Sequence, residues 1–78
     1  MENSGALKVG KTYQILGYRQ CCPVRIMRRL CDLGLIPEKK LKVEKKSLFG
    51  KAILIETQGY TLSMQRSMTN YLLLRESK

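Results

Sequence analysis

The sequence contains no histidine and no tryptophan, and one phenylalanine and six acidic residues occur among its 78 positions. Without histidine and with scattered carboxylates, no nucleophile has a neighbouring general base, so we expect no catalytic site. The ligands that most transition metals prefer are scarce for the same reason, and we expect no resident metal or other cofactor. A peptide groove lined with aromatic side chains, which proline-rich ligands require, is not expected either.

Long apolar runs are also missing. No apolar stretch approaches the roughly 18 residues of a membrane span, and residues 1–6 lack the apolar centre of a signal peptide. We therefore predict a cytoplasmic protein that does not insert into the membrane. The length allows one small domain, which we place at residues 7–75, after a flexible N-terminal tail at residues 1–6.

The cysteines are too few and too irregular for a disulfide framework. Cys21, Cys22 and Cys31 are an odd number, and none of them lies in a CxxC pair of the kind that binds zinc. We expect Cys31 to be a buried structural thiol, whereas Cys21 and Cys22 are expected to be partly exposed. A metal-responsive regulatory domain that uses these thiols is one alternative function.

Positive charge is the property that the sequence has in excess. Fifteen lysine and arginine residues give a net charge of +9, which suits nucleic acid, an anionic membrane surface or an acidic protein partner. The alternative is a solvated surface without a partner. Two clusters are candidates for partner contacts, one on a predicted helix and one beside a predicted turn: Arg25, Arg28 and Arg29, and Lys45, Lys46 and Lys51.

The periodicity of the apolar residues predicts a mainly β protein. Aromatic and β-branched residues from Tyr13 onward indicate a first strand, and Pro23 suits the first position of a helix that ends near Leu33. Met27 and Leu30 are expected on the buried side of this helix. Further strands are predicted at residues 40–46, 51–57, 60–65 and 71–74, with a helical turn at 66–70 and a tail at 75–78. Such short strands indicate a small barrel, closed so that no sheet edge is exposed, with the helix at one end.

Residues 28–37 combine a helix end with the entry to a strand. Leu30 and Leu33 are three positions apart and share one face of the helix. Gly34 follows where a helix closes in the left-handed conformation, and Pro37 cannot continue the helix. The segment thus predicts a helix that turns directly back onto the barrel.

The turn between the strands at 40–46 and 51–57 carries two large apolar residues, Leu48 and Phe49. Such a pair is hard to bury locally at a hairpin tip. If it is exposed, it forms a docking site for a partner protein. The alternative is that the tip folds over the end of the barrel.

The segment at 28–37 resembles the ferrous iron transport protein A family, FeoA. That family has an arginine–leucine pair, a Leu-Gly-Leu-Ile-Pro run and a later Gly-x-x-Leu-x-Leu strand. The matching positions here are Arg29-Leu30, residues 33–37 and residues 59–64. The resemblance extends over nearly the whole chain.

The resemblance implies an SH3-like barrel and a cytoplasmic accessory or regulatory role in bacterial ferrous iron (Fe²⁺) uptake. The implied partner is FeoB, the membrane permease with a cytoplasmic GTP-binding domain, which would keep the protein peripheral to the inner membrane. Transition metal ion binding is a common label for this family, so the resemblance also implies transient binding of Fe²⁺ or another transition metal. The sequence departs from the family at Glu38, where glycine is frequent, and at Met68-Thr69, where an acidic residue and alanine are frequent.

We therefore expect an adaptor protein that docks through the apolar hairpin tip and the two basic clusters. The alternative that follows from charge alone is a nucleic-acid-binding small barrel with strongly salt-dependent affinity. Nucleic acid is not favoured, because no recognisable nucleic-acid motif accompanies the four tyrosines.

Overall fold

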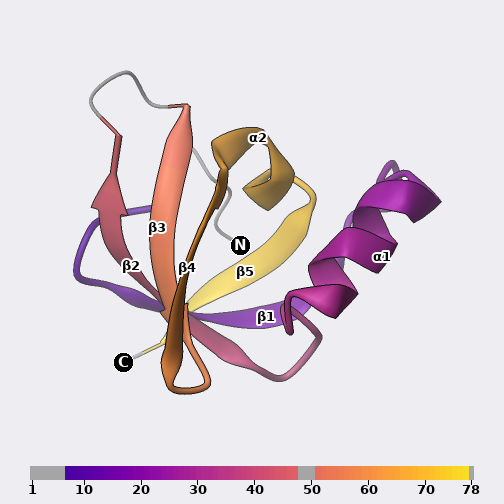
Figure 1. Cartoon of the computed structure of the whole chain (residues 1–78). Helices are drawn as coiled ribbons and strands as arrows, with labels where there is room; N and C mark the ends of the chain where they lie inside the picture. The colour runs from indigo at the N-terminus through magenta and orange to yellow at the C-terminus, as the bar shows by residue number, and fades with distance from the viewer. Residues whose placement is uncertain (1–6, 48–50, 78) are drawn as a thin grey trace.

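The computed structural model describes residues 7–47 and 51–77, which form five strands and two helices (Figure 1). In chain order these are β1 (Thr12–Tyr18), α1 (Val24–Asp32), β2 (Lys40–Lys46), β3 (Ala52–Thr57), β4 (Tyr60–Gln65), α2 (Arg66–Thr69) and β5 (Leu72–Ser77). The strands form one antiparallel sheet in the order β4-β3-β2-β1-β5. The prediction of a mainly β small barrel is therefore confirmed.

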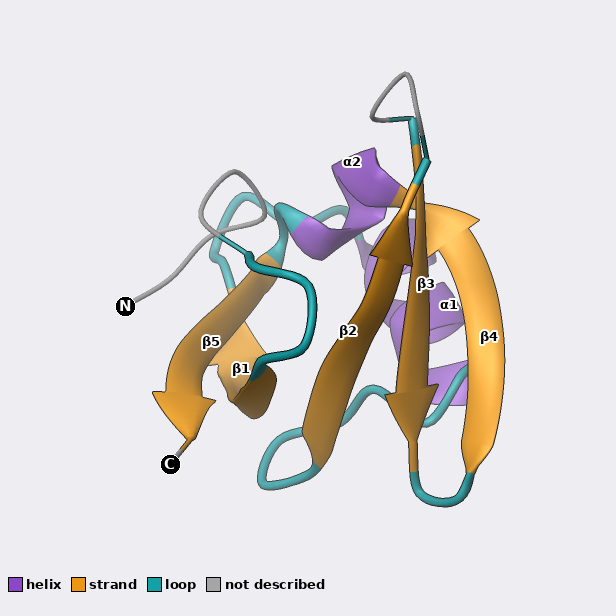
Figure 2. Cartoon of the chain, turned by 90° about the vertical axis from the view of Figure 1, so that its left-hand side faces the viewer, coloured by secondary structure: helices purple, strands orange, loops and turns teal. Residues whose placement is uncertain are grey.

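Strand pairing does not close this barrel. β4 and β5 are the two edges of the sheet, and α2 connects them along the chain. Figure 2 shows β1 and β5 on one side of the curled sheet and β2, β3 and β4 on the other. The expectation that closure removes the sheet edges is therefore wrong for the described residues. Closure would need a ladder between β4 and β5, and the chain runs through α2 between them instead.

A bulge in β1 produces the bend between the two halves of the sheet. β1 pairs with β2 from Thr12 to Gln14 and with β5 along its whole length. The register with β5 shifts between Ile15 and Gly17, which leaves Leu16 as the extra residue. An extra residue increases the local twist of a strand. β1 can thus belong to both halves of the curled sheet.

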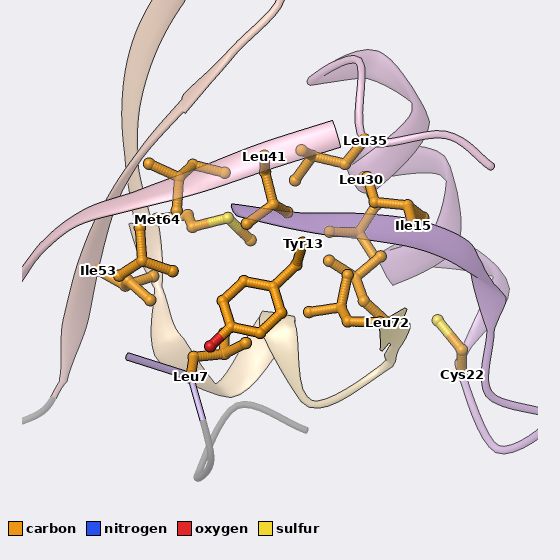
Figure 3. Packing of buried hydrophobic residues seen from close by; sticks show 13 residues of the cluster. Leu7, Tyr13, Ile15, Cys22, Leu30, Leu35, Leu41, Ile53, Met64 and Leu72 are labelled. Carbon is orange, nitrogen blue, oxygen red and sulfur yellow. The ribbon is translucent and has the colours of Figure 1, made fainter. Parts of the chain in front are cut away.

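The alternating apolar residues of the strands point into one core (Figure 3). Tyr13 lies at its centre, and its phenol oxygen accepts a hydrogen bond of 2.9 Å from the backbone N–H of Lys8. Its polar group is therefore satisfied although the ring is fully buried. The buried apolar residues are Leu7, Tyr13, Ile15, Cys22, Leu30, Leu35, Leu41, Val43, Ile53, Ile55, Met64, Leu72 and Leu74.

The last strand is longer than the sequence predicted. β5 continues to Ser77, and its residues beyond Leu74 pair with the first half of β1, as in Arg75 with Gln14. The prediction of a tail that begins at Arg75 is therefore wrong. The apolar pattern stops at Leu74, but backbone pairing depends on the neighbouring strand and not on side-chain polarity.

Helix α1 contacts the core through a narrower face than its sequence predicted. Leu30 is its one fully buried residue, Met27 is half-buried, and Cys31 is exposed. The prediction that Cys31 is buried is wrong, because each helical position turns the side chain by about 100°, which takes Cys31 away from the face of Leu30. Cys22 was expected to be partly exposed, yet it is buried as a member of the core cluster, whereas its neighbour Cys21 is exposed.

The end of α1 is a Schellman motif, as the sequence predicted. Gly34 has a left-handed φ of 85°, and its N–H donates to the carbonyl of Cys31 at 2.9 Å. The N–H of Leu35 donates to the carbonyl of Leu30, also at 2.9 Å, and both leucine side chains are fully buried. This pattern of two hydrogen bonds and one apolar contact fixes the direction in which the chain leaves the helix.

Candidate partner-docking surface

The basic residues predicted as partner contacts are on the surface, but they form two separate groups. Lys45 and Lys51 are exposed and Lys46 is half-buried, at the ends of β2 and β3 next to the hairpin turn. Arg25 and Arg28 are exposed on α1. Figure 1 places α1 on the opposite side of the molecule from the end of β2 and the start of β3. The two basic clusters therefore do not form one continuous surface.

The base of the β2–β3 hairpin is held by a serine that the sequence reasoning did not identify. The Ser47 hydroxyl accepts hydrogen bonds from the backbone N–H groups of Lys51, at 3.0 Å, and Ala52, at 3.1 Å. The N–H of Ser47 donates to the carbonyl of Ala52. Leu48 and Phe49, the predicted apolar tip, lie outside the described residues, so their docking role stays a prediction.

The fold brings Arg66 next to the basic residues of the β2–β3 hairpin. Its backbone N–H donates to the carbonyl of Lys51 at 3.0 Å, which continues the pairing of β3 and β4 into α2. Lys51, Gln65, Arg66 and Ser67 line one hollow of about 390 Å³. Two basic residues that are 15 positions apart in the sequence, Lys51 and Arg66, therefore lie side by side. Antiparallel pairing of the flanking strands was the signal that could have predicted it.

Arg29 differs from the other two helix arginines because it lines a groove. The groove lies between α1 on one side and β4 with α2 on the other, and its volume is about 340 Å³. Arg29 and Leu33 come from the helix side, and Met64 and Met68 face them. Neither Arg25 nor Arg28 lines this groove. Spacing along the helix placed the three arginines together, but the packing of α1 separates Arg29 from them.

The surplus of positive charge cannot be neutralised within the chain. Fifteen basic residues face six acidic ones, so at least nine cations have no acidic partner of their own. Lys42 and Glu44 form an ion pair at 3.9 Å, but both side chains are well exposed and such pairs contribute little. The protein therefore presents a positive field that attracts anionic partners.

Tyr18 links β1 to the end of α1. Its hydroxyl donates to the carbonyl of Leu35 at 2.6 Å and lies 3.3 Å from the sulfur of Cys31. Burial raises the pKa of the Tyr18 phenol well above its ordinary value, and the hydrogen bond and charge of Cys31 and the charge of Cys22 act in the same direction. Burial also raises the pKa of the Cys22 thiol, with smaller contributions from Cys21 and Cys31. The Tyr18 phenol and the Cys22 thiol are therefore neutral at physiological pH.

Replacing Tyr18 with phenylalanine is expected to flatten the loss of stability at alkaline pH. An unfolded tyrosine has a pKa of about 10, so the stabilisation by the neutral phenol is complete below pH 10. It is lost as the pH rises from about 10 toward the raised folded-state pKa. At pH 7 the variant should be less stable by about 1 kcal/mol, because one hydrogen bond is lost. Urea unfolding of both proteins under reducing conditions, from neutral to alkaline pH, measures this. Parallel pH curves would contradict it.

Metal ligands are sparse on this surface. Within residues 7–47 and 51–77, no three cysteine, aspartate or glutamate side chains lie close enough together to hold a metal ion. No helix in the same ranges has the length and apolarity needed to cross a membrane.

Nearly the whole sequence matches one protein family. The match is to the FeoA domain and extends over residues 5–76. The chain belongs to the FeoA family. It is thus a member of a family of ferrous iron transport proteins, and the resemblance first seen in residues 28–37 is confirmed. The comparison with curated proteins gives no match.

Solved structures of FeoA proteins share this fold. The FeoA protein from Chlorobium tepidum is 27% identical, with a TM-score of 0.82, and the match covers 96% of this chain and 70% of that one. A FeoA-like protein from Clostridium acetobutylicum is 19% identical, with a TM-score of 0.84 over 95% of this chain and 84% of that one.

A third similar structure is described as an SH3 domain. The FeoA of Stenotrophomonas maltophilia, complexed with zinc, is described as a procaryotic SH3 domain protein and a candidate activating factor for ferrous iron transport. It is 14% identical to this FeoA-family chain, with a TM-score of 0.79 over 96% of this chain and 91% of that one. The predicted SH3-like fold is therefore confirmed.

Proposed function

We propose that this FeoA-family protein is a cytoplasmic accessory and regulatory protein of ferrous iron uptake, which docks on the cytoplasmic part of a FeoB-type permease with its GTP-binding domain. Family membership over residues 5–76 is the observation that carries the proposal. The net charge of +9 and the exposed basic groups support an anionic protein surface as the partner. Through the permease, the protein would lie at the inner membrane without inserting into it.

The docking surface that we propose is the β2–β3 hairpin with its basic residues. Lys45 and Lys51 are exposed at its base, and Arg66 lies beside Lys51. Leu48 and Phe49 complete the proposed surface as an apolar centre. Apolar contact surrounded by charge is typical of energetically important interface positions, where the apolar part contributes affinity and the charges speed association.

A pull-down of the permease's cytoplasmic part tests this function. The wild-type protein should capture it, and Phe49→Ala should weaken capture about tenfold or more, as loss of a central aromatic contact does. A double variant, Lys45→Gln with Lys51→Gln, should weaken capture about threefold to tenfold and reduce its salt dependence. The matched control is Lys39→Gln with Lys40→Gln, which removes two exposed charges at the other end of β2.

The outcomes separate the parts of the proposal. Failure of the wild-type protein to capture the permease overturns the proposed function. Equal losses in the two double variants overturn the hairpin as the docking surface, because they show a response to net charge alone. Tight, steeply salt-dependent binding of duplex DNA or RNA, with no capture of the permease, would favour the nucleic-acid alternative.

A further inference from the structure

The open edge of β4 is the unusual feature of this barrel. Gln58 and Gly59 form a two-residue turn in which both residues have positive φ, 53° and 87°. Such a turn makes its flanking residues, Thr57 and Tyr60, a hydrogen-bonded pair. Backbone groups alternate in direction along a strand, so those of Leu62 and Met64 also face β3.

The backbone groups of Thr61 and Ser63 therefore point away from the sheet. The hydrogen bond from the N–H of Arg66 to the carbonyl of Lys51, two positions beyond Met64, agrees with this alternation. β4 pairs with β3 and is an edge of the sheet, and Figure 2 shows it at the outer side. An edge of this kind can accept a further strand.

The sequence of β4 does nothing to block such pairing. Its six residues, Tyr60–Gln65, include neither proline nor a charged side chain. Proteins usually protect exposed edges with those residues, with bulges or with a covering helix. The other edge strand, β5, by contrast, carries Arg75 and Glu76. Of the two edge strands, β4 is thus the one whose own residues leave the edge open to pairing.

The groove of about 340 Å³ runs beside this edge. Ser63, Met64 and Gln65 of β4 line one side of it, and Arg29 of α1 and Leu33, which follows the helix directly, line the other. Tyr60 anchors one end, since its hydroxyl donates to the carbonyl of Leu33. Arg29 supplies a cation at the surface, whereas leucine and methionine side chains supply an apolar and adaptable wall.

We propose that the groove between β4 and α1 binds an extended acidic–apolar peptide segment of the partner protein, which adds to β4 as a sixth strand. Its backbone would pair with Thr61 and Ser63, a carboxylate would contact Arg29, and an apolar side chain would pack against Met64 and Leu33. This site rests on the proposed function for the identity of its partner. The net charge of +9 favours an acidic segment over a basic one.

A synthetic peptide provides the first test. The probe is an acetylated, amidated peptide of about six residues, the usual length of a strand, in which glutamate alternates with valine. In an NMR titration of the full chain, it should shift the backbone amides of Thr61 and Ser63 and the side chain of Arg29. The same peptide with methylated backbone nitrogens should bind at least about tenfold more weakly, because it cannot pair as a strand. A lysine–valine peptide should not bind.

Matched variants provide the second test. Arg29→Gln should weaken binding about tenfold, whereas Arg28→Gln, one position away and outside the groove, should change it less than about twofold. Ser63→Pro removes the outward N–H and should weaken binding about tenfold, whereas Ser63→Ala keeps that N–H and should bind as the wild type does. If Ser63→Pro does not fold, the methylated peptide makes the same comparison on the unaltered protein.

Three results would overturn the site. These are no binding of the glutamate–valine peptide up to about 1 mM, equal effects of Arg28→Gln and Arg29→Gln, and equal affinity for the methylated peptide. The permease pull-down distinguishes this failure from failure of the proposed function. Capture that survives both Arg29→Gln and Ser63→Pro removes the groove and leaves the function standing, whereas no capture by the wild-type protein removes the function.

Discussion

Gly34→Ala is expected to destabilise the protein by about 3 kcal/mol. Gly34 has a φ of 85°, a conformation that costs an L-residue about 1 kcal/mol. A Cβ at this position would also meet the Tyr60 hydroxyl and lie 2.9 Å from Nε2 of Gln58. Gln58 donates to the carbonyl of Gly34 at 2.8 Å and Tyr60 to that of Leu33. Loss of these two hydrogen bonds adds about 1 kcal/mol each.

Urea unfolding measures this change, and Gly10→Ala is the matched control. Gly10 has nearly the same φ, 88°, but a Cβ there meets nothing within 4 Å. The control should therefore lose only the conformational part, about 1 kcal/mol. Equal losses at the two glycines would show that the contact of the β3–β4 turn with the end of α1 contributes nothing. A domain of this size has a total stability of about 4 to 12 kcal/mol, so the expected loss at Gly34 is large.

Leu30→Ala is expected to cost about 3 kcal/mol, within the range of about 2 to 5 for buried leucines. Leu30 is the one fully buried residue of α1. Its side chain is therefore the main apolar contact between the helix and the core. Figure 3 shows its side chain beside Leu35 and Ile15, which the truncation would leave facing a cavity. The expected result is a lower midpoint of urea denaturation with a detached or frayed α1, seen as lost amide protection in hydrogen exchange.

Cys31→Ala, the neighbouring position, is the control for that experiment. The side chain of Cys31 is exposed and its sulfur makes one exposed contact, with the Tyr18 hydroxyl, so its removal should change the free energy of unfolding by less than about 1 kcal/mol. The sequence had predicted a buried structural thiol at Cys31, for which a larger loss of stability would be expected. A loss at Cys31 as large as the loss at Leu30 would mean that the helix packs on the barrel by a different face.

The strands could be predicted closely because each repeats a two-residue pattern against a single core. β2 and β4 have the predicted bounds, residues 40–46 and 60–65. Apolar and polar residues alternate along all of β4 and along β2 as far as Glu44. The predicted β5 ended at Leu74, where the alternation stops, but the pairing with β1 continues beyond that residue. Local pattern reports which side chains are buried. It does not report where a backbone ladder ends.

The candidate site was less predictable for a related reason. The exposure of Arg25, Arg28 and Lys51 followed from composition alone, but their grouping did not. Arg66 lies next to Lys51 because β3 pairs with β4. Arg29 lies next to Met64 because α1 packs beside the edge of the sheet. Contacts between residues distant in the sequence depend on how elements pack, and no short-range pattern encodes that.

By itself, the sequence determined the FeoA family and the order and type of the secondary-structure elements, because these follow from motifs and local periodicity. It also determined the Schellman end of α1, because Gly34 is a residue without a Cβ. The tertiary structure alone decided that the barrel stays unclosed between β4 and β5, that Cys22 and not Cys31 is buried, and that Arg29 faces an open strand edge. These features arise from the rotation of α1 against the sheet and from the path of the chain through α2, which are properties of packing between elements and not of any element alone.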